Sequence, residues 1–355
     1  MTVLLKGYYG AGNLGDDVLL IVCSKAIRAA LKNVKILYTD IRGYGYVEHR
    51  WQFDMIGVPR DIHYEQVDVE ILGGGGQFFD FRGHSNVVDI ARQYLLRHIG
   101  IKFVEHVLEV VGRGPKERFH SKRLRAGIGL GLGPFAMGSR REFDAARILS
   151  QCSFLHVRDH ESRMYCDRWK VPLHCKKLVD ISFAHELWLQ GGGGSRRKNV
   201  SSRRPVIGFV LRDWKFGSAE SWIHGIESAA DYLQRNGFDI VLIFLSKEDD
   251  ENVIHRFAKK YDSVMYDPMK SDPCSFVEVF RWCDVVVSAR AHGVFCSAIV
   301  GTPVIGIEIE PKIKNACRMM GEGAQLWSNP YDVGELLGMI RERVERRAVY
   351  VEKLG

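Results

Sequence analysis

Residues 283–315 combine a short apolar strand pattern, a turn and a helix pattern with several charged side chains. Residues 284–288 form a β-branched run of the kind that is buried in a parallel sheet, and residues 294–300 begin a helix pattern. The turn between them is therefore predicted at residues 289–293. A buried strand that leads directly into a helix is typical of α/β proteins.

The polar residues of this turn are suited to an anionic ligand. Ser288, Arg290 and His292 occupy alternate positions, so in an extended chain their side chains would point the same way. The carboxyl ends of strands are where open α/β sheets bind ligands, and the free N–H groups of the following helix favour anions. We therefore expect an anionic substrate here.

Length and composition limit the class of protein. A chain of 355 residues, 46% hydrophobic and 26% charged, predicts about two domains with sizeable cores. No apolar run approaches the roughly 20 residues of a membrane span, and the opening MTVLLKGYYG is typical of a first strand rather than a signal peptide. The eight cysteines show no CxxC pair and no zinc spacing, so we expect reduced thiols and no metal site.

The formal charge of +7 favours an acidic partner, which could be a phosphorylated substrate, a lipid headgroup or a nucleic acid. The sequence contains no zinc finger, RNP-like motif or basic region with interleaved aromatic residues. Nucleic acid is therefore the least supported of the three.

Two glycine-rich segments follow predicted strands in the first half of the chain. The segment GYYGAGNLGDD follows a strand at residues 3–8 and precedes a helix that is expected to begin near Asp17. This order is used to bind phosphates or dinucleotides, although the P-loop ending of Lys-Ser/Thr is missing. The second segment, Gly73 to Gly76, follows a strand at residues 67–72, and we interpret it as a turn that a ligand approaches. A helical pattern at residues 86–111 is expected to pack on the sheet, with membrane contact as the lesser alternative.

The alternation of strands and helices predicts two Rossmann-like domains. We assign residues 1–189 to the first domain and residues 205–330 to the second. Residues 190–204 lack apolar periodicity and contain GGGGS, so they are interpreted as the linker. Residues 331–355 form a charged amphipathic helix that could cross back onto the first domain.

Six motifs, taken together and in this order, resemble the bacterial polysaccharide pyruvyl transferase family. They are GYYGAGNLGDD, LGGGG, GLGP, VRDHES, LVDISF and SARAHGVFCSAIVGTPVIGIEIEPK. The resemblance covers nearly the whole chain outside the linker and the last helix. It implies a GT-B-like fold, with two Rossmann-like domains facing each other across a cleft. It also implies transfer of the enolpyruvyl unit of phosphoenolpyruvate to a sugar, closure of a cyclic ketal and release of phosphate.

The resemblance also indicates the site residues. Arg158 matches the arginine of the VRD motif, and Arg290, His292 and Lys312 match the carboxy-terminal motif; spacing favours Lys312 over Lys314. The catalytic set is predicted to be His292, Arg158 and Lys312. The predicted substrate-binding set is Asn13, Gly12, Gly15, Gly74, Gly75, Arg290 and Gly293. An Asp16–Asp17 pair stands where many members have Asp-Glu.

These residue types suit the chemistry. Phosphoenolpyruvate carries a phosphate and a carboxylate, which Arg158, Arg290 and Lys312 could hold without a metal or other cofactor. His292 is the predicted acid that protonates the enol carbon, although a histidine at a helix start is often only structural. The base that activates the sugar hydroxyls stays open. The candidates are Asp16, Asp17, Glu308 and His292 itself.

Two other functions fit the same pattern. One is a GT-B glycosyltransferase that uses a nucleotide sugar, and the other is a noncatalytic subunit that binds a glycan precursor. For the favoured function the acceptor is a sugar of a polysaccharide or of its lipid-linked precursor. A lipid carrier would agree with the basic charge and with a cytoplasmic protein held at the inner face of the membrane.

Overall fold

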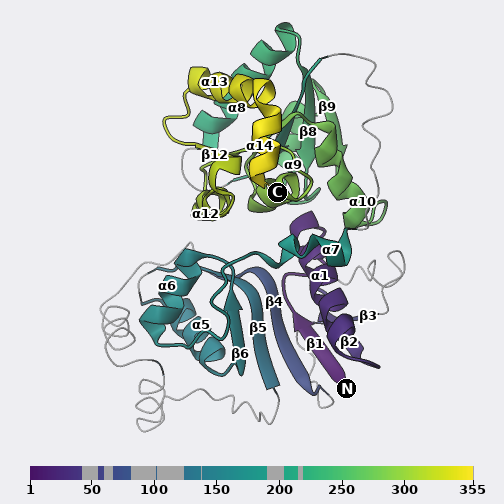
Figure 1. Ribbon diagram of the computed structural model, residues 1–355, viewed down its shortest axis with the longest axis vertical. Helices are drawn as coiled ribbons and strands as arrows, with labels where there is room; N and C mark the ends of the chain where they lie inside the picture. The colour runs from purple at the N-terminus through teal and green to yellow at the C-terminus, as the bar shows by residue number, and fades with distance from the viewer. Residues whose placement is uncertain are drawn as a thin grey trace. The chain divides into compact units, whose positions relative to one another are not determined.

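The structure is a computed structural model that describes residues 1–41, 55–59, 67–80, 101, 124–136, 138–189, 204–214 and 219–354 (Figure 1). Contacts divide the chain into two compact units. The first comprises Met1–Ala11 and Leu19–Ile181, and the second comprises Gly12–Val18 and Ser182–Gly355. The chain thus passes between the units near Ile181, before the predicted linker, of which residues 190–203 lie outside the described residues.

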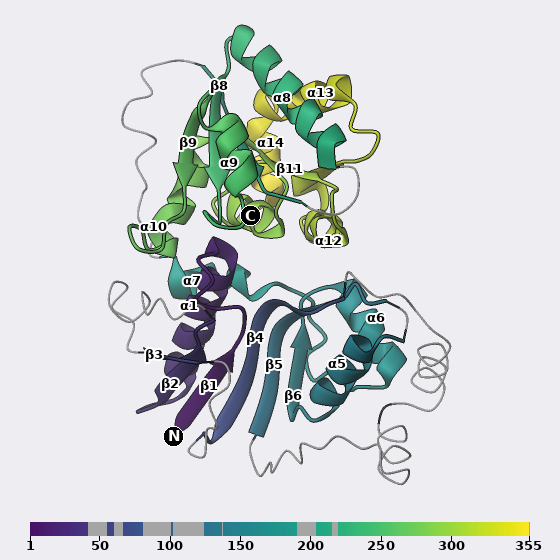
Figure 2. The same ribbon diagram turned by 180° about the vertical axis from the view of Figure 1, so that it is seen from behind.

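The first unit contains a six-stranded parallel sheet of order β3-β2-β1-β4-β5-β6, which is the strand order of doubly wound dinucleotide-binding folds (Figure 2). Its strands are β1 (Thr2–Lys6), β2 (Lys35–Thr39), β3 (Met55–Val58), β4 (Val69–Phe78), β5 (Leu124–Leu132) and β6 (Phe154–Val157). Its helices are α1 (Leu14–Ala30), whose first residues belong to the second unit, α5 (Arg140–Ser150) and α6 (His160–Trp169).

The second unit repeats this topology, because the order β12-β11-β10-β7-β8-β9 has the same pattern of connections. Its strands are β7 (Val206–Leu211), β8 (Asp239–Phe244), β9 (Asp262–Met265), β10 (Val285–Ser288), β11 (Val304–Ile307) and β12 (Ala324–Trp327). Its helices are α7 (His185–Trp188), α8 (Ala219–Arg235), α9 (Glu251–Phe257), α10 (Pro273–Val277), α11 (Ala291–Ile299), α12 (Pro311–Met319), α13 (Val333–Glu345) and α14 (Arg347–Leu354).

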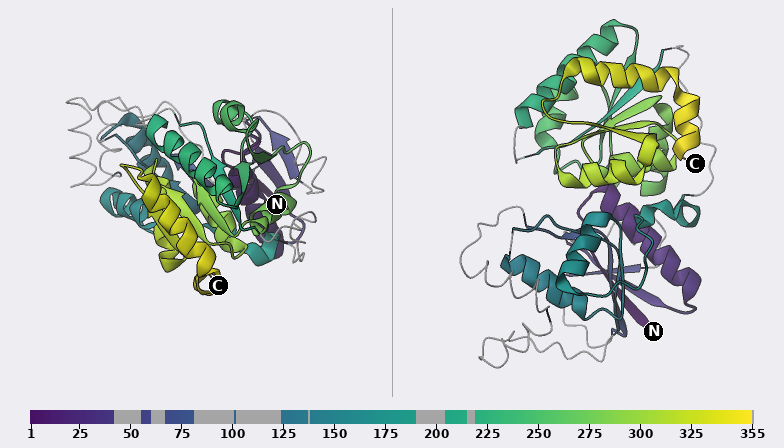
Figure 3. Two further views of the ribbon diagram at one scale, coloured as in Figure 1. Left: turned by 90° about the horizontal axis from the view of Figure 1, so that it is seen from above. Right: turned by 60° about the vertical axis from the view of Figure 1, so that its left-hand side comes forward.

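The core of the second unit explains why its central strands are continuous apolar runs. Every residue of β7 and of β10 is buried, as expected for strands that are covered on both faces. One face packs against α8 and α13 (Figure 3). The cluster of buried side chains there includes Trp222 and Leu336. The C-terminal helices α13 and α14 belong to this unit by their contacts.

The second glycine segment is part of a strand, and the predicted turn is therefore wrong. Strand β4 continues through all four glycines and pairs with β5 along them. A Cβ atom at Gly73 would lie 2.5 Å from the Oη of Tyr9, and one at Gly74 would lie 3.0 Å from Leu19 of α1. Gly74 and Gly75 also have positive φ angles, of 45° and 78°. The close packing of Tyr9 and Leu19 on β4 accounts for glycine at Gly73 and Gly74.

The predicted helix at residues 86–111 lies outside the described residues except for Ile101. Among the helices that the structure does describe, not one combines the length and the apolar character needed to cross a membrane.

A buried histidine in β6 ties together three segments of the first unit. The Nδ1 atom of His156 accepts a hydrogen bond of 3.1 Å from the backbone N–H of Gly129, so its Nε2 carries the proton and donates to the carbonyl of Lys177 at 2.8 Å. Burial lowers the pKa of His156 below its ordinary value of 6.5. The folded protein therefore favours the neutral ring.

We expect His156 to contribute stability that is present above pH 6.5 and is lost as the pH falls below it, because the unfolded chain binds the proton more readily. In His156→Gln the amide can accept from Gly129 and donate to Lys177 but does not titrate. Urea unfolding at pH values of about 7.5 and about 5.5 should show a larger loss of unfolding free energy for the native protein than for the variant. Equal losses in the two proteins would contradict the prediction.

Candidate functional site

The candidate site lies at the carboxyl edge of the second sheet, where β10 passes into α11. Arg290 is the N-cap of α11 and has an extended backbone, with φ −132° and ψ 135°. The Oγ of Ser288 accepts from the Arg290 N–H at 3.1 Å and donates to the Arg290 carbonyl at 2.7 Å. A Cβ at Gly293 would lie 2.2 Å from this Oγ, so the turn requires glycine. The predicted alternation ends at Arg290, because His292 is already in the helix.

Arg290 is held by a buried carboxylate. Its guanidinium, in a residue that is 7% exposed, forms an ion pair with Asp250, which follows β8 and is fully buried. Asp250 Oδ1 also accepts a hydrogen bond of 3.2 Å from the N–H of Asp213. Burial raises the pKa of Asp250, and the charge of Arg290 acts against that rise. The pair fixes the direction of the Arg290 fork.

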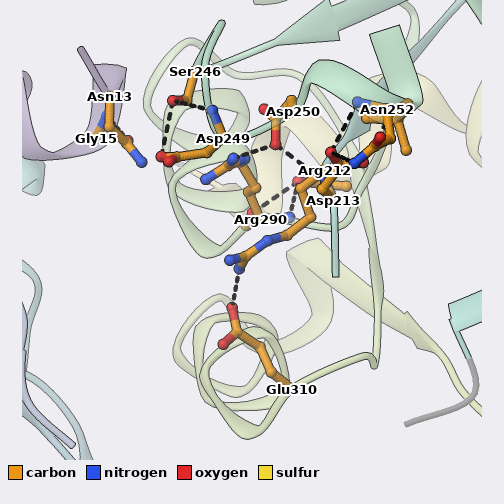
Figure 4. A network of polar contacts seen from close by, with 12 residues as sticks. Asn13, Gly15, Arg212, Asp213, Ser246, Asp249, Asp250, Asn252, Arg290 and Glu310 are labelled. Atoms are coloured by element: carbon orange, nitrogen blue, oxygen red, sulfur yellow. Dashed lines mark hydrogen bonds and ion pairs between the residues drawn. The ribbon is translucent and has the colours of Figure 1, made fainter. Parts of the chain in front are cut away.

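Arg212 is a site residue that the sequence reasoning missed. It directly follows β7, bonds Glu310 at 2.7 Å and places its guanidinium 4.7 Å from the centre of the Trp214 ring. Figure 4 shows Arg212 and Arg290 between the carboxylates of Asp250 and Glu310. Burial and then the like charge of Arg290 lower the pKa of Arg212, so the two cations lie close enough to repel each other.

The two arginines flank the point where the strand order reverses. From β7 the chain proceeds to β8 and β9 on one side, then returns to β10 and continues on the other. Such switch points are where open α/β sheets bind ligands. Within the described residues, the Nε atoms of Arg212 and Arg290 are buried without a hydrogen-bond partner. An anion placed here would satisfy these donors and relieve the repulsion.

The first glycine loop forms part of the same unit. Asn13 forms an antiparallel bridge with Ser246, and the N–H of Leu14 donates to the Leu245 carbonyl at 2.9 Å. The Asn13 Oδ1 accepts from the Gly15 N–H at 2.9 Å (Figure 4). The buried Asp17 accepts from the Tyr266 hydroxyl at 2.8 Å. These bonds fasten residues 12–18 to the ends of β8 and β9.

The loop sets the space around His292. A Cβ at Gly15 would lie 2.1 Å from the Nδ1 of His292. The His292 ring also packs edge to face against Phe295, with a centroid distance of 5.8 Å. Because Gly15 has no side chain, it leaves the space that the imidazole of His292 occupies. Gly12, with φ 70°, provides the left-handed turn that precedes the bridge, and a Cβ there would lie 3.8 Å from Pro268.

Both candidate lysines lie in α12. Lys314 bonds Glu308 at 2.6 Å, and the second carboxylate oxygen of Glu308 accepts from the Ser328 hydroxyl at 2.5 Å. Burial would raise the pKa of Glu308, but the hydrogen bonds from Lys314 and Ser328 outweigh it and lower the pKa. Lys314 therefore has a structural partner. Lys312 is partly buried in the first turn of α12, which follows β11 at the same edge.

Arg158 lies in the first unit, directly after β6. It is 3% exposed and bonds Asp180 at 3.1 Å and Asp159 at 3.3 Å. Although burial acts in the opposite direction, these carboxylates raise the pKa of Arg158. A Cβ at Gly131 would lie 2.7 Å from the Arg158 Nε, so the strand accommodates the guanidinium closely. The structure thus gives Arg158 a clear role in the core of this unit.

The predicted residues therefore divide between the units. The second unit contains Gly12, Asn13, Gly15, Arg290, His292, Gly293 and Lys312. The first contains Gly74, Gly75 and Arg158. In the described part of the chain no group of three or more His, Cys, Asp or Glu side chains is arranged to hold a metal ion.

Solved structures of sugar-handling enzymes are similar to this chain along its whole length. HepE of Anabaena, in complex with UDP and glucose, has 11% sequence identity and a TM-score of 0.55, with coverage of 100% of this chain and 93% of that one. The UDP-GlcNAc 2-epimerase of Methanocaldococcus jannaschii, in complex with UDP-GlcNAc and UDP, has 11% identity and a TM-score of 0.54, with coverage of 97% and 92%. The E. coli ADP-heptose LPS heptosyltransferase II has 14% identity and a TM-score of 0.50, with coverage of 98% and 100%.

At these identities the likeness shows the fold, which is of the GT-B type with two Rossmann-like domains. No curated protein matches the chain in sequence. The family model described as polysaccharide pyruvyl transferase matches residues 13–311, which include both the glycine loop and the turn from β10 to α11. The chain therefore belongs to the polysaccharide pyruvyl transferase family.

Proposed function

We propose that this protein transfers the enolpyruvyl group of phosphoenolpyruvate to a sugar of a polysaccharide or of its lipid-linked precursor, forms a cyclic pyruvate ketal and releases phosphate. Family membership supports the reaction class. The observation that carries the proposal is the pair of guanidinium groups of Arg212 and Arg290, whose buried Nε atoms have no hydrogen-bond partner among the described residues. Arg290 lies two residues before His292.

Phosphoenolpyruvate has two anionic groups, and the site offers donors for both. Arg212 and Arg290 supply guanidinium forks, and Lys312 supplies a further charge from α12. The free N–H groups at the start of α11, a helix of nine residues, add to this preference for anions. Asp250 and Glu310 hold the forks in place, so little side-chain entropy is lost when the substrate binds. In the first unit, the role of Arg158 toward substrate remains a proposal.

In the proposed mechanism the imidazolium of His292 donates its proton to C3 of the enol, and the C2–C3 π electrons form the new C–H bond. C2 becomes an oxocarbenium-like centre, which a sugar hydroxyl attacks. The C2–O bond to phosphate then breaks with its electron pair, and a second hydroxyl attacks C2 to close the ketal. Of the two hydroxyl protons, one returns to His292 and one leaves with phosphate.

The hydrogen bonds of the candidate carboxylates bear on which group would remove the proton from the sugar hydroxyl. Asp17 is fully buried and accepts the Tyr266 hydroxyl, and Glu308 has a lowered pKa through its hydrogen bonds. Both are weak candidates for removing a proton. His292 becomes basic once it has protonated the enol. We therefore favour His292 as acid and base in succession, with Asp16 as the remaining carboxylate.

The nucleotide-sugar glycosyltransferase is the second candidate, because two of the similar structures contain UDP. Thermal denaturation with added ligand separates the two functions. Phosphoenolpyruvate should raise the melting temperature if the protein is a pyruvyl transferase, whereas UDP or GDP should raise it if the protein is a glycosyltransferase. Phosphate release from phosphoenolpyruvate in the presence of synthetic or lipid-linked glycans then tests transfer itself. No release with any acceptor, together with stabilisation by UDP or GDP alone, would contradict the proposal.

A lipid-linked acceptor would bring the protein to the inner face of the cytoplasmic membrane. The formal charge of +7 supports contact with anionic lipid. Co-sedimentation with vesicles that contain anionic lipid should fall as salt rises, because the attraction is electrostatic. Equal recovery with neutral and anionic vesicles would remove this part of the proposal.

His292 and Arg290 are predicted to affect different kinetic constants. His292→Ala should fold normally and lose about 10²- to 10⁴-fold in kcat, the usual contribution of a general acid. Arg290→Lys keeps a charge beside Asp250 but loses the planar fork, so we expect KM for phosphoenolpyruvate to rise at least about tenfold. Arg256→Ala, which removes an arginine that pairs with Glu227 on the surface, is the control and should change neither constant. Full activity in His292→Ala would remove it from the mechanism.

Gly15 is predicted to matter for activity more than for stability. In Gly15→Ala the new methyl group would meet the His292 ring, while the helix itself accepts alanine. We expect a loss of kcat of more than about tenfold without a loss of thermal stability. Gly338→Ala, in α13 with nothing within 4 Å of the added Cβ, is the matched control. It should keep full activity, and equal activity of the two variants would contradict the role assigned to Gly15.

A further inference from the structure

We infer that a polar cavity in the first unit binds a hexose ring of the acceptor glycan, an assignment that rests on the proposed function. The cavity has a volume of about 280 Å³. Its lining combines charged, amide and aromatic side chains. They include Lys6, Tyr8, Glu70, Gln77, Phe78 and Arg125.

The cavity lies beside β1, β2, β4 and β5 of the first sheet. In the order β3-β2-β1-β4-β5-β6 the chain reverses direction between β1 and β4. Lys6 is the last residue of β1, Tyr8 follows it, and Gln77 and Phe78 end β4. Glu70 and Arg125 are the second residues of β4 and β5, so the charged part of the cavity lies toward the amino ends of these strands. The cavity therefore has polar groups both beside the end of β1 and along the neighbouring strands.

The charges in the cavity favour hydroxyl groups over an anion. Glu70 receives the Nε of Arg125 at 2.8 Å and the Nζ of Lys6 at 3.1 Å, so both cations already have a carboxylate. Glu70 and Arg125 are each 8% exposed, and Arg125 also donates to Gln151 at 2.8 Å. An incoming anion would have to compete with the buried Glu70 for these donors. A neutral polyol can add hydrogen bonds to this network without breaking it.

Other lining groups are fixed in ways that suit a sugar ring. The Gln77 Nε2 donates to the carbonyls of Gly73 and Gly74 at 2.7 and 3.1 Å, which sets the plane of its amide. The Thr39 hydroxyl exchanges hydrogen bonds with the N–H and carbonyl of Gly7, and so supports the turn that carries Tyr8. Tyr8 is 47% exposed and Phe78 is partly buried. Their rings offer apolar surface for the C–H faces of a sugar.

The volume also limits the ligand. Pockets for drug-sized molecules span roughly 300–1,000 Å³, and the volume of this cavity, about 280 Å³, lies just below that range. One monosaccharide ring suits it better than a nucleotide sugar. The two units therefore divide the substrates, with the anionic donor at the switch point of the second sheet and one ring of the acceptor in the cavity of the first unit.

Binding of methyl glycosides of glucose, galactose, mannose and N-acetylmannosamine to the full-length protein tests the assignment directly, by saturation-transfer NMR. We expect at least one glycoside to bind, and its affinity to fall about tenfold or more in Tyr8→Ala and in Gln77→Ala. Tyr232→Ala removes a tyrosine of similar exposure, 40%, from α8 and should bind as the native protein does. Inorganic phosphate and UDP should not displace the glycoside. Failure of all four glycosides to bind, or unchanged binding in both cavity variants, overturns the inference.

Phosphate release from phosphoenolpyruvate separates this inference from the function on which it rests. In Tyr8→Ala and Gln77→Ala, KM for the glycan acceptor should rise while KM for phosphoenolpyruvate stays the same. If both variants turn over with an unchanged KM for the acceptor, the assignment of the cavity is wrong and the proposed function stands. The native protein could also bind a glycoside, lose that binding in both variants and show no turnover of phosphoenolpyruvate. In that case the sugar site stands and the proposed transferase activity is wrong.

Discussion

The ion pair between Arg290 and Asp250 is the contact on which the candidate site depends. Taking both charges out of water costs several kcal/mol, and their attraction offsets that cost only where further hydrogen bonds are made. Asp250 gains one from the Asp213 backbone, whereas the Arg290 Nε has no partner among the described residues. The pair is therefore a costly way to stabilise a fold. Its geometry is better explained by a requirement for a fixed guanidinium that points one donor at a ligand.

A second pair, between Arg212 and Glu310, makes that explanation stronger. Each arginine has its own carboxylate, yet burial and then the charge of Arg290 still lower the pKa of Arg212. A structure selected only for stability would separate them, because like charges in a buried site destabilise it. The repulsion decreases when a doubly charged anion binds. The arrangement is therefore matched to the bound state more than to the empty one.

Much of the fold could be predicted because apolar runs are local signals. The strand expected at residues 206–211 is β7, and that expected at 240–244 differs from β8 by one residue. The predictions were wrong where the packing partner that requires a given residue comes from a distant part of the sequence. Gly73 and Gly74 are small because Tyr9 and Leu19 approach them, and no local pattern distinguishes this from a ligand turn. The contact of Gly15 with His292 is another such case.

Arg212 was missed although the sequence contained a usable signal. It directly follows a buried strand, as Arg158 does, and Asp250 lies a few residues beyond the next strand. The strand order, which the sequence does not state, makes β10, β7 and β8 neighbours and so brings Arg290, Arg212 and Asp250 together. A charged residue at one strand end is weak evidence for a site. Several such residues become strong evidence once the topology places their strands side by side.

The two sheets share a strand order but differ in the balance of charge in their polar clusters. In the first, one carboxylate, Glu70, lies between two cations and occupies their donors. In the second, each guanidinium keeps an Nε without a partner in the described chain, beside the start of a nine-residue helix. Under the functions proposed above, the first cluster favours neutral hydroxyls and the second favours an anion. The proposed reaction joins an anionic enol to a polyol and would use both kinds of cluster, one in each of two units that share a topology.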